Sequence, residues 1–410
     1  MRSLDRRTFI KGLTGVSSAA ILGPHLVSTA LQARMEEPLE KRPNIVVILA
    51  DDHGYAHSGC YGDPNVKTPH IDGLAGEGMR FTRVFAPSSI CTPSRSALFT
   101  GCYPHKIGCH KNHGAVYSHI KSLPHYFFAL GYEVGLSGVY HVKPQKAFPF
   151  QFINGSNLRD FLAGEMGRPY CLVIGLFTPH RPYLEQFQGK SYDPREIVLE
   201  PHLVDTPETR QDMAYYYNSV SAADREVGQY MEWLKESGQQ ENTLLIYTSD
   251  HGPCLPFAKW TNYDSGLRVP FVARWPGVIP AGATSEGLVS LVDLLPTLIE
   301  LAGGSLPEKL DGKSFGALLR GKSQTHRQSV FACHTHTGVL NSQGTEFPIR
   351  SIRTSKYKYI LNLKPEETFH TFFRPGKENL DACQILWNSW VRNAEEQSFA
   401  ALQIERVLHH

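Results

Sequence analysis

The chain has 410 residues, of which 41% are hydrophobic and 20% are charged. This composition is typical of a globular protein with one large α/β core or two domains, and it excludes extensive disorder. The formal net charge is +2, and residues 1–33 hold four basic residues and one acidic residue, which leaves about −1 for the rest. A near-neutral chain lacks the basic field that binds a nucleic-acid backbone, so we expect no nucleic-acid partner. An anionic substrate must then be bound by local cationic groups.

The first 33 residues have the pattern of an export signal. Two arginines, Arg6 and Arg7, precede an apolar stretch at 12–27 that ends near small residues. This is the pattern of a twin-arginine signal peptide with a cleavage zone. A membrane anchor is the alternative, but the stretch contains Pro24 and is too short and too weakly apolar to span a bilayer comfortably. We therefore expect cleavage of residues 1–33, the twin-arginine translocase as a partner, and a periplasmic or secreted mature protein.

Three continuous apolar runs predict strands that are buried on both faces of a parallel sheet. They lie at 44–50, 171–177 and 243–248. Helical patterns occur between and beside these runs, at 68–78, 94–100, 122–130 and 210–236. Alternation of strands and helices predicts an α/β fold in which helices sandwich a mostly parallel sheet.

The character of the chain changes after residue 321. Segments 347–354 and 356–361 alternate apolar and polar residues and predict an antiparallel hairpin. We expect a catalytic α/β domain at 34–321 and a smaller C-terminal subdomain with an antiparallel sheet at 322–410. The last segment, 394–410, has a helical pattern and stops without a cap, so this subdomain is expected to be truncated.

Carboxylates follow two of the predicted buried strands. Asp51 and Asp52 come directly after the first strand, and Asp250 follows the strand at 243–248. Open α/β sheets bind ligands at the carboxyl ends of their strands, and ionised carboxylates lie close together only where a cation neutralises them. Each Asp alone could be a helix N-cap. The recurrence of Asp-His-Gly after both strands favours a divalent metal site.

The most informative motif begins at Cys91, which opens the run Cys-Thr-Pro-Ser-Arg-Ser-Ala-Leu-Phe-Thr-Gly ending at Gly101. A buried thiol in a turn before a helix is the simpler explanation of an isolated cysteine. The full run resembles the signature of the type I sulfatases of the alkaline phosphatase superfamily. Segments 42–52, 67–72, 138–142 and 248–252, with 178–180 and 259–275, extend the resemblance over most of the chain. Within that family the chain is most similar to the heparan N-sulfatases, or sulfamidases.

The resemblance implies a cofactor and a set of metal ligands. In this family the thiol is oxidised to formylglycine by a formylglycine-generating enzyme that reads the unfolded chain, which makes that enzyme a partner during maturation. Calcium would be the metal, with Mn²⁺ or Zn²⁺ as less favoured alternatives. The implied metal ligands are Asp51, Asp52, Asp250, His251 and the modified Cys91.

The resemblance also implies catalytic roles. Formylglycine at Cys91 would supply one hydroxyl of its hydrate to attack sulfur and a second whose deprotonation expels sulfate. Arg95 would stabilise the hydrate, and His141 would assist its second hydroxyl. His180 and Lys259 would bind the sulfate group and assist the leaving group. Other histidines near these motifs are weaker candidates for contact with a sulfated saccharide substrate: His53, His57, His70, His105, His110 and His113.

Two positions depart from the family pattern. Relatives usually have lysine where Val139 stands, and Lys143 is the nearby cation that could reach the same space and bind substrate. His251 stands where the sulfamidases have asparagine. Since calcium prefers oxygen ligands, an imidazole there either stays outside the metal's ligand shell or shifts the preference towards manganese or zinc.

Three functions remain open from the sequence. The leading one is an exported sulfatase or sulfamidase that removes sulfate from a saccharide. The second is a phosphonate or phosphate monoester hydrolase on the same scaffold, which His251 favours. The third is an inactive protein that binds sulfated glycans, which Val139 favours. The eight cysteines allow disulfides in an exported protein, but the sequence assigns no pairing. It also leaves the oligomeric state open.

Overall fold

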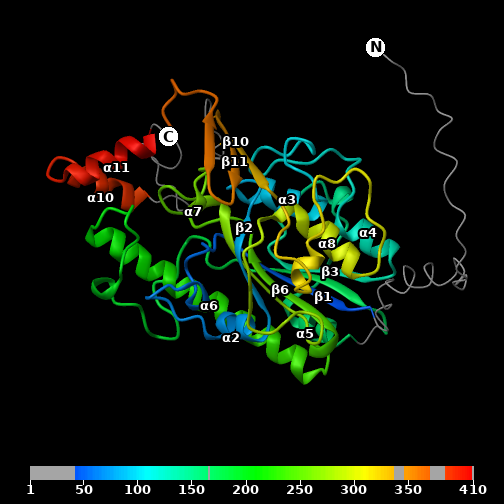
Figure 1. The fold of residues 1–410 in the computed structure, drawn as a ribbon. Coiled ribbons are helices and arrows are strands. Elements are labelled where there is room, and N and C mark those ends of the chain that lie inside the picture. The colour runs from blue at the N-terminus through cyan, green and yellow to red at the C-terminus, as the bar shows by residue number, and fades with distance from the viewer. Residues whose placement is uncertain (1–41, 165–166, 337–345, 370–383, 409–410) are drawn as a thin grey trace, which may run out of the picture. The chain divides into compact units, whose positions relative to one another are not determined.

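The computed structural model describes residues 42–164, 167–336, 346–369 and 384–408. The predicted signal peptide at 1–33 lies outside these residues. The central feature is a nine-stranded sheet with the order β4-β3-β5-β1-β6-β7-β2-β8, in which β9 also pairs with β2 (Figure 1). Strands β4, β3, β5, β1 and β6 run parallel, whereas β7 pairs antiparallel with both β6 and β2. The predicted α/β fold with a mostly parallel sheet is confirmed.

The strands of this sheet are short and mostly buried. Their bounds are β1 Asn44–Ala50, β2 Met79–Phe85, β3 Glu133–Gly138, β4 Gln151–Phe152, β5 Tyr170–Gly175, β6 Thr243–Ser249, β7 Arg268–Arg274, β8 Ala283–Ser285 and β9 Val289–Ser290. The central strand β1 is buried along its whole length.

Helices cover both faces of the sheet, and the alternation of side chains along β1 explains why. Ile45, Val47 and Leu49 point into one apolar core, whereas Val46 and Ile48 point into the other. The first core includes apolar residues of α3, α4 and α8. The second includes apolar residues of α2, α5 and α6. A strand that is buried on both faces must be apolar at every position, and this is the continuous run that the sequence shows.

The α-helices that frame the sheet differ greatly in length. Their bounds are α2 Pro69–Glu77, α3 Cys91–Thr100, α4 Leu123–Ala129, α5 Leu158–Ala163, α6 Pro207–Glu236, α7 Asp264–Leu267, α8 Leu294–Leu301 and α9 Gly316–Leu319. Helix α6 begins after Thr206, whose side chain accepts a hydrogen bond from the Thr209 N–H as an N-cap. Among the residues that the structure describes, no helix is both long and apolar enough to cross a membrane.

A second, antiparallel sheet follows, with the order β10-β11-β12. Its strands are β10 Ser329–His336, β11 Glu346–Thr354 and β12 Lys358–Asn362, so the predicted hairpin at 347–361 is confirmed and gains a third strand. Helices α10 Gln384–Asn393 and α11 Ser398–Leu408 complete this part of the chain. Trp390 of α10 is fully buried and donates a hydrogen bond to Thr209 Oγ1 of α6 at 3.0 Å. The domain boundaries at 34 and 321 stay predictions.

Candidate active site

The carboxyl ends of β1 and β6 carry the predicted acidic residues. Ala50 of β1 pairs with Ser249 of β6, so the residues that follow each strand emerge side by side. The Asp52 N–H donates a hydrogen bond to Asp250 Oδ1 at 3.3 Å. Asp52 adopts a positive φ of 69°, which is strained for a residue other than glycine. This turn brings the carboxylates of Asp51, Asp52 and Asp250 to one buried place.

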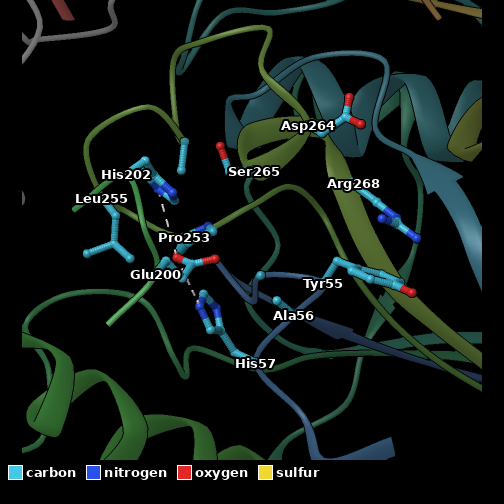
Figure 2. A pocket seen from close by; sticks show the side chains of 12 residues that line it. Tyr55, Ala56, His57, Glu200, His202, Pro253, Leu255, Asp264, Ser265 and Arg268 are labelled. Carbon is cyan, nitrogen blue, oxygen red and sulfur yellow. Dashed lines mark ion pairs between the residues drawn. The ribbon is translucent and has the colours of Figure 1, made fainter. Parts of the chain in front are cut away.

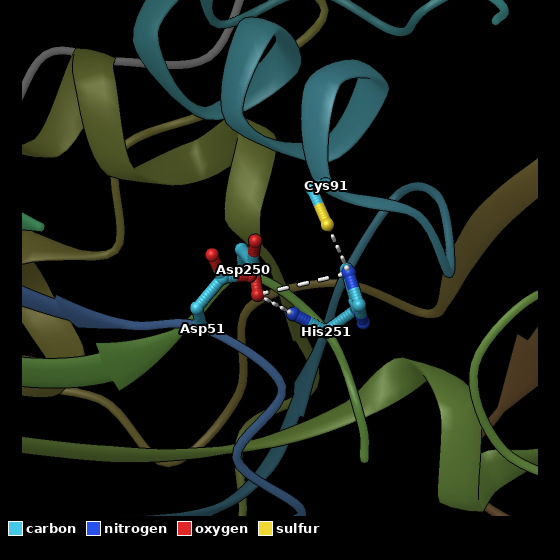
Figure 3. Close-up of side chains that lie close together, drawn as sticks. All are labelled: Asp51, Cys91, Asp250 and His251. Atoms are coloured by element: carbon cyan, nitrogen blue, oxygen red, sulfur yellow. Dashed lines mark hydrogen bonds and ion pairs between the residues drawn. The ribbon is translucent and has the colours of Figure 1, made fainter. Parts of the chain in front are cut away.

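Cys91 is the first residue of α3 and points into the same place (Figure 3). Its side chain is 1% exposed, and its Sγ lies 3.2 Å from Nε2 of His251. Ser94, on the first turn of this helix, donates a hydrogen bond from Oγ to the Asp250 carbonyl at 2.6 Å. This hydrogen bond connects helix α3 to the residue that follows β6. The N-terminus of α3 therefore lies next to the acidic cluster.

Arg95 lies one turn further along α3 and is fully buried. Its Nε donates a hydrogen bond to Asp250 Oδ2 at 2.9 Å, and its Nη2 lies 3.3 Å from Asp51 Oδ2. A third nitrogen, Nη1, donates to the carbonyl of Val139 at 3.2 Å. The buried guanidinium therefore neutralises part of the acidic cluster and links it to the end of β3.

Lys259 neutralises Asp52. Its Nζ lies 2.9 and 2.8 Å from the two carboxylate oxygens of Asp52 and 4.8 Å from the centre of the Trp260 ring. His180, which follows β5, has its Nε2 4.0 Å from Asp52 Oδ2. Burial would raise the pKa of Asp52, but its neighbours, above all the ammonium group of Lys259, lower it. Asp52 is therefore a carboxylate at neutral pH.

His141 approaches the site from the loop after β3. Its Nε2 lies 3.0 Å from Nδ1 of His113, and the two ring centres are 4.7 Å apart. Burial, the charge of Arg95 and the neighbouring His113 lower the pKa of His141 to about 3. The imidazole is therefore neutral at pH 7. The His113 N–H donates to Thr92 Oγ1 of α3 at 3.0 Å, which places this pair beside Cys91.

The donor atoms of this cluster fit a divalent metal. One group combines Asp51, Cys91, Asp250 and His251, and a second combines Asp51, Asp52, Cys91 and His180, with the donor atoms of each group within 4.8 Å of one another. Oδ1 of Asp51 is buried and accepts no hydrogen bond. Burial and the carboxylate of Asp250 raise the pKa of Asp51 to about 7 in the metal-free protein. A buried, unpaired carboxylate oxygen in a cluster of acids is what a cation would satisfy.

His251 presents a nitrogen to this cluster. Its Nδ1 donates to the Gly252 carbonyl at 2.8 Å, because a carbonyl oxygen can only accept. Burial outweighs the neighbouring carboxylates and lowers the pKa of His251, so the ring is neutral and Nε2 carries a lone pair. That Nε2 lies 3.4 Å from Asp52 Oδ1. In the group that His251 joins, one nitrogen therefore lies beside two carboxylates and the sulfur of Cys91.

The structure gathers the residues predicted for catalysis and metal binding, with Lys143 as the exception. The side chain of Lys143 is exposed, and within the described ranges no hydrogen bond or ion pair joins it to Cys91 or to the acidic cluster. Its role in substrate binding stays a prediction. His113, one of the weaker candidates from the sequence, lies at the site beside His141. Tyr216 also reaches the site but has no sequence signal, since it comes from a helix more than 150 residues away.

Comparison with known proteins decides the family. The family model described as Sulfatase matches residues 43–165 and 153–305. The chain belongs to the sulfatase family. A second family model, N-sulphoglucosamine sulphohydrolase, C-terminal, matches residues 252–375 of this sulfatase. The resemblance on which the sequence prediction rested is thus confirmed.

Individual relatives agree with this assignment. An ulvan-active sulfatase of Formosa agariphila is 38% identical over 84% of this chain and 70% of the relative. The human N-sulphoglucosamine sulphohydrolase is 30% identical over 78% of this chain and 73% of the relative. The crystal structure of Ps i-CgsB superimposes with a TM-score of 0.64 and 26% identity, covering 78% of this chain and 84% of that one. The protein is a sulfuric ester hydrolase with relatives that act on sulfated saccharides.

Proposed function

We propose that this sulfatase hydrolyses sulfate esters or N-sulfate groups of sulfated saccharides with a formylglycine made from Cys91 and a divalent metal. The observation that carries the proposal is the position of Cys91, buried at the N-terminus of α3 with its Sγ in the same donor cluster as Asp51, Asp250 and His251. When present, the metal would polarise the sulfuryl oxygens and lower the pKa of the attacking hydroxyl. Calcium is the proposed ion, held by Asp51, Asp52, Asp250 and His251.

The neighbouring side chains have separate roles in this proposal. Arg95 forms ion pairs with the carboxylates of Asp51 and Asp250. These contacts fix the position of the acidic cluster relative to the residue at position 91 on the same helix. Lys259 supplies positive charge where sulfate oxygens would lie, and this charge stabilises the transition state, while His180 binds the sulfate group beside it. His141, a neutral imidazole in the loop after β3, assists the second hydroxyl at position 91.

The choice of a saccharide rests on the relatives. One is an ulvan-active sulfatase, and another is N-sulphoglucosamine sulphohydrolase. The side chains at the site recognise the sulfate group rather than the sugar. We therefore propose a sulfated saccharide as the substrate class and leave the sugar and the N- or O-linkage to a substrate panel.

The first test is the mass of the tryptic peptide that contains Cys91, from protein purified out of its native host. We expect the mass of an aldehyde at position 91 together with release of sulfate from sulfated saccharides. A wholly unmodified thiol in that protein would contradict the mechanism. It would favour a protein that binds sulfated glycans without turnover.

One observation favours a second function, phosphonate or phosphate monoester hydrolysis at the same site. Nε2 of His251 is a nitrogen donor among carboxylates, and such a ligand set suits manganese or zinc better than calcium. A comparison of kcat/KM for sulfate esters and phosphonate monoesters, with each metal added to metal-free protein, separates the two functions. Faster turnover of phosphonate monoesters than of every sulfate ester would establish the second.

We also propose export by the twin-arginine route to the periplasm or beyond. The support is the Arg6-Arg7 pair with the apolar stretch that follows it. That route transports folded proteins, and the oxidation of a cysteine that becomes buried must precede folding. Both conditions are met if the cysteine is converted first, the chain then folds, and the folded protein is exported last.

A further inference from the structure

A tyrosine from the middle of α6 reaches the strained turn that carries Asp52. The hydroxyl of Tyr216 accepts a hydrogen bond from the Gly54 N–H at 3.0 Å and lies 3.4 Å from the Asp52 carbonyl oxygen. Tyr216 is fully buried. The hydroxyl thus bridges the two ends of the turn from Asp52 to Gly54.

The turn needs such support because its conformation is unfavourable by itself. Asp52 has a positive φ of 69°, and a residue in that region is held there by its surroundings. The Asp52 N–H is held by Asp250, and the His53 N–H donates to Ser249 Oγ at 2.9 Å. Ser249 is the last residue of β6, and Asp250 directly follows it. On the α6 side, the hydroxyl of Tyr216 contacts the backbone of the turn.

A second pair of residues orients the hydroxyl. Nδ1 of His57 lies 3.1 Å from the Tyr216 oxygen, and Nε2 of His57 lies 3.6 Å from Glu200 Oε2. Figure 2 shows His57 and His202 on either side of Glu200, at a cavity of about 180 Å³. Burial would lower the pKa of His57, but Glu200 raises it. A protonated His57 donates to the hydroxyl, which leaves the hydroxyl proton for the Asp52 carbonyl.

We propose that Tyr216 is a positioning residue of this sulfatase, which holds the turn at Asp52 so that the Asp52 carboxylate faces the metal site and Lys259. Glu200 orients His57, and His57 in turn fixes the direction in which the Tyr216 hydroxyl donates its hydrogen bond. Groups that support metal ligands in this manner commonly change metal affinity by 10- to 100-fold. Neither the acidic motif nor the cysteine motif contains these three residues.

The test compares Tyr216→Phe with Tyr217→Phe in the full chain. Tyr217 is the next residue of the same helix and is equally buried, but its hydroxyl accepts from Asn65 Nδ2 at 3.1 Å. Hydrogen exchange of the peptide at 51–57 and calcium affinity by calorimetry are measured for both. We expect roughly tenfold faster exchange and at least about tenfold weaker calcium binding in Tyr216→Phe alone. Glu200→Gln is expected to change both quantities in the same direction by less.

The two measurements separate this inference from the proposed function. The calcium measurement rests on the proposed metal site, whereas the exchange measurement depends on neither metal nor turnover. Unchanged exchange at 51–57 in Tyr216→Phe, or equal changes in both tyrosine variants, would overturn the role of Tyr216. If wild-type protein binds no divalent ion, the proposed metal site fails, and the exchange result alone decides the role of Tyr216.

Discussion

The environment of Cys91 is unsuited to an ordinary cysteine nucleophile. Burial raises the pKa of its thiol well above the usual value, and the carboxylates of Asp51, Asp250 and Asp52 raise it further against the opposing charge of Lys259. A thiolate is the reactive form of cysteine, and this site disfavours it. The hydroxyl of a formylglycine hydrate is neutral, and a metal ion bound beside it would offset the negative charge of the carboxylates. Such a nucleophile is compatible with these surroundings. The electrostatics of the residue therefore agree with the proposed conversion to formylglycine.

Lys259 is expected to contribute to the transition state more than to the fold. Replacing it in Lys259→Met should lower kcat by roughly 10²- to 10³-fold, because a positive group directed at developing charge is lost. Calcium affinity should not weaken, since the ammonium group repels the metal from Asp52. Steady-state kinetics and calorimetry check both parts, with the exposed Lys235→Met as the control. A folded Lys259→Met protein whose kcat is within threefold of the wild-type value would contradict the assigned role.

Protons and metal should compete for Asp51. In metal-free protein the pKa of Asp51 is raised from 3.8 to about 7, so its contribution to stability is present at low pH and is lost as pH rises through 7. A metal replaces the proton and restores that stability. Below about pH 7, affinity for the metal should fall by about tenfold per pH unit, and the metal-induced rise in Tm should be larger at about pH 8 than at about pH 5.5. Thermal unfolding checks this, and an equal rise at both pH values, or an unaltered one in Asp51→Asn, would contradict it.

At the scale of elements, the strands that could be predicted are those with a continuous apolar run in the sequence. Strand β1 is a continuous apolar run, and it was predicted with its observed bounds, Asn44–Ala50. Strands β2 and β7 were not predicted, since β2 contains two arginines and β7 contains Pro270, a residue that is rare inside a sheet. Their pairing buries them in spite of this composition. Strand pairing over almost 200 residues of chain has no local signal.

The residues of the candidate site also fall into those that local sequence could predict and those that it could not. The acidic residues could be predicted because they follow buried strands, and Cys91 could be predicted because its motif is contiguous. Tyr216 could not, because a tyrosine on the apolar face of α6 reads as part of the core. Only the packing of α6 against the end of β1 reveals that its hydroxyl contacts the backbone at Gly54.

The close approach of β3 and β5 positions the backbone that holds Arg95. A Cβ at Gly138 would lie 2.1 Å from the Gly175 carbonyl oxygen, and φ of Gly138 is 77°. Gly138→Ala should therefore destabilise the protein by roughly 2–5 kcal/mol, the combined effect of a left-handed backbone and overpacking. Gly131→Ala is the matched control, because Gly131 also has a positive φ, of 80°, with no atom within 4 Å of the added Cβ. Chemical denaturation should show only about 1–2 kcal/mol of destabilisation there, and equal values for both variants would refute the steric argument.

At the scale of the whole molecule, the proposed conversion of Cys91 and the proposed export both depend on when the chain folds. Cys91 is 1% exposed in the folded protein, so a modifying enzyme cannot reach it after folding. An export route that carries unfolded chains would remove the chain from a cytoplasmic enzyme before the thiol is oxidised. The proposed twin-arginine signal would avoid this conflict, because the chain would fold in the compartment in which it is converted.

Export should therefore depend on the arginine pair and be independent of the conversion itself. With the double substitution Arg6→Lys and Arg7→Lys, we expect folded, uncleaved protein to accumulate inside the cell. The reason is that the translocase recognises the signal peptide by its arginine pair. Cys91→Ser preserves the size of the buried side chain and should be exported like the wild type, with no turnover. Cell fractionation and N-terminal sequencing in the native host check both, and the mature chain should begin near residue 34. Normal export of the double variant would exclude the twin-arginine route. Retention of Cys91→Ser would instead show that export depends on conversion.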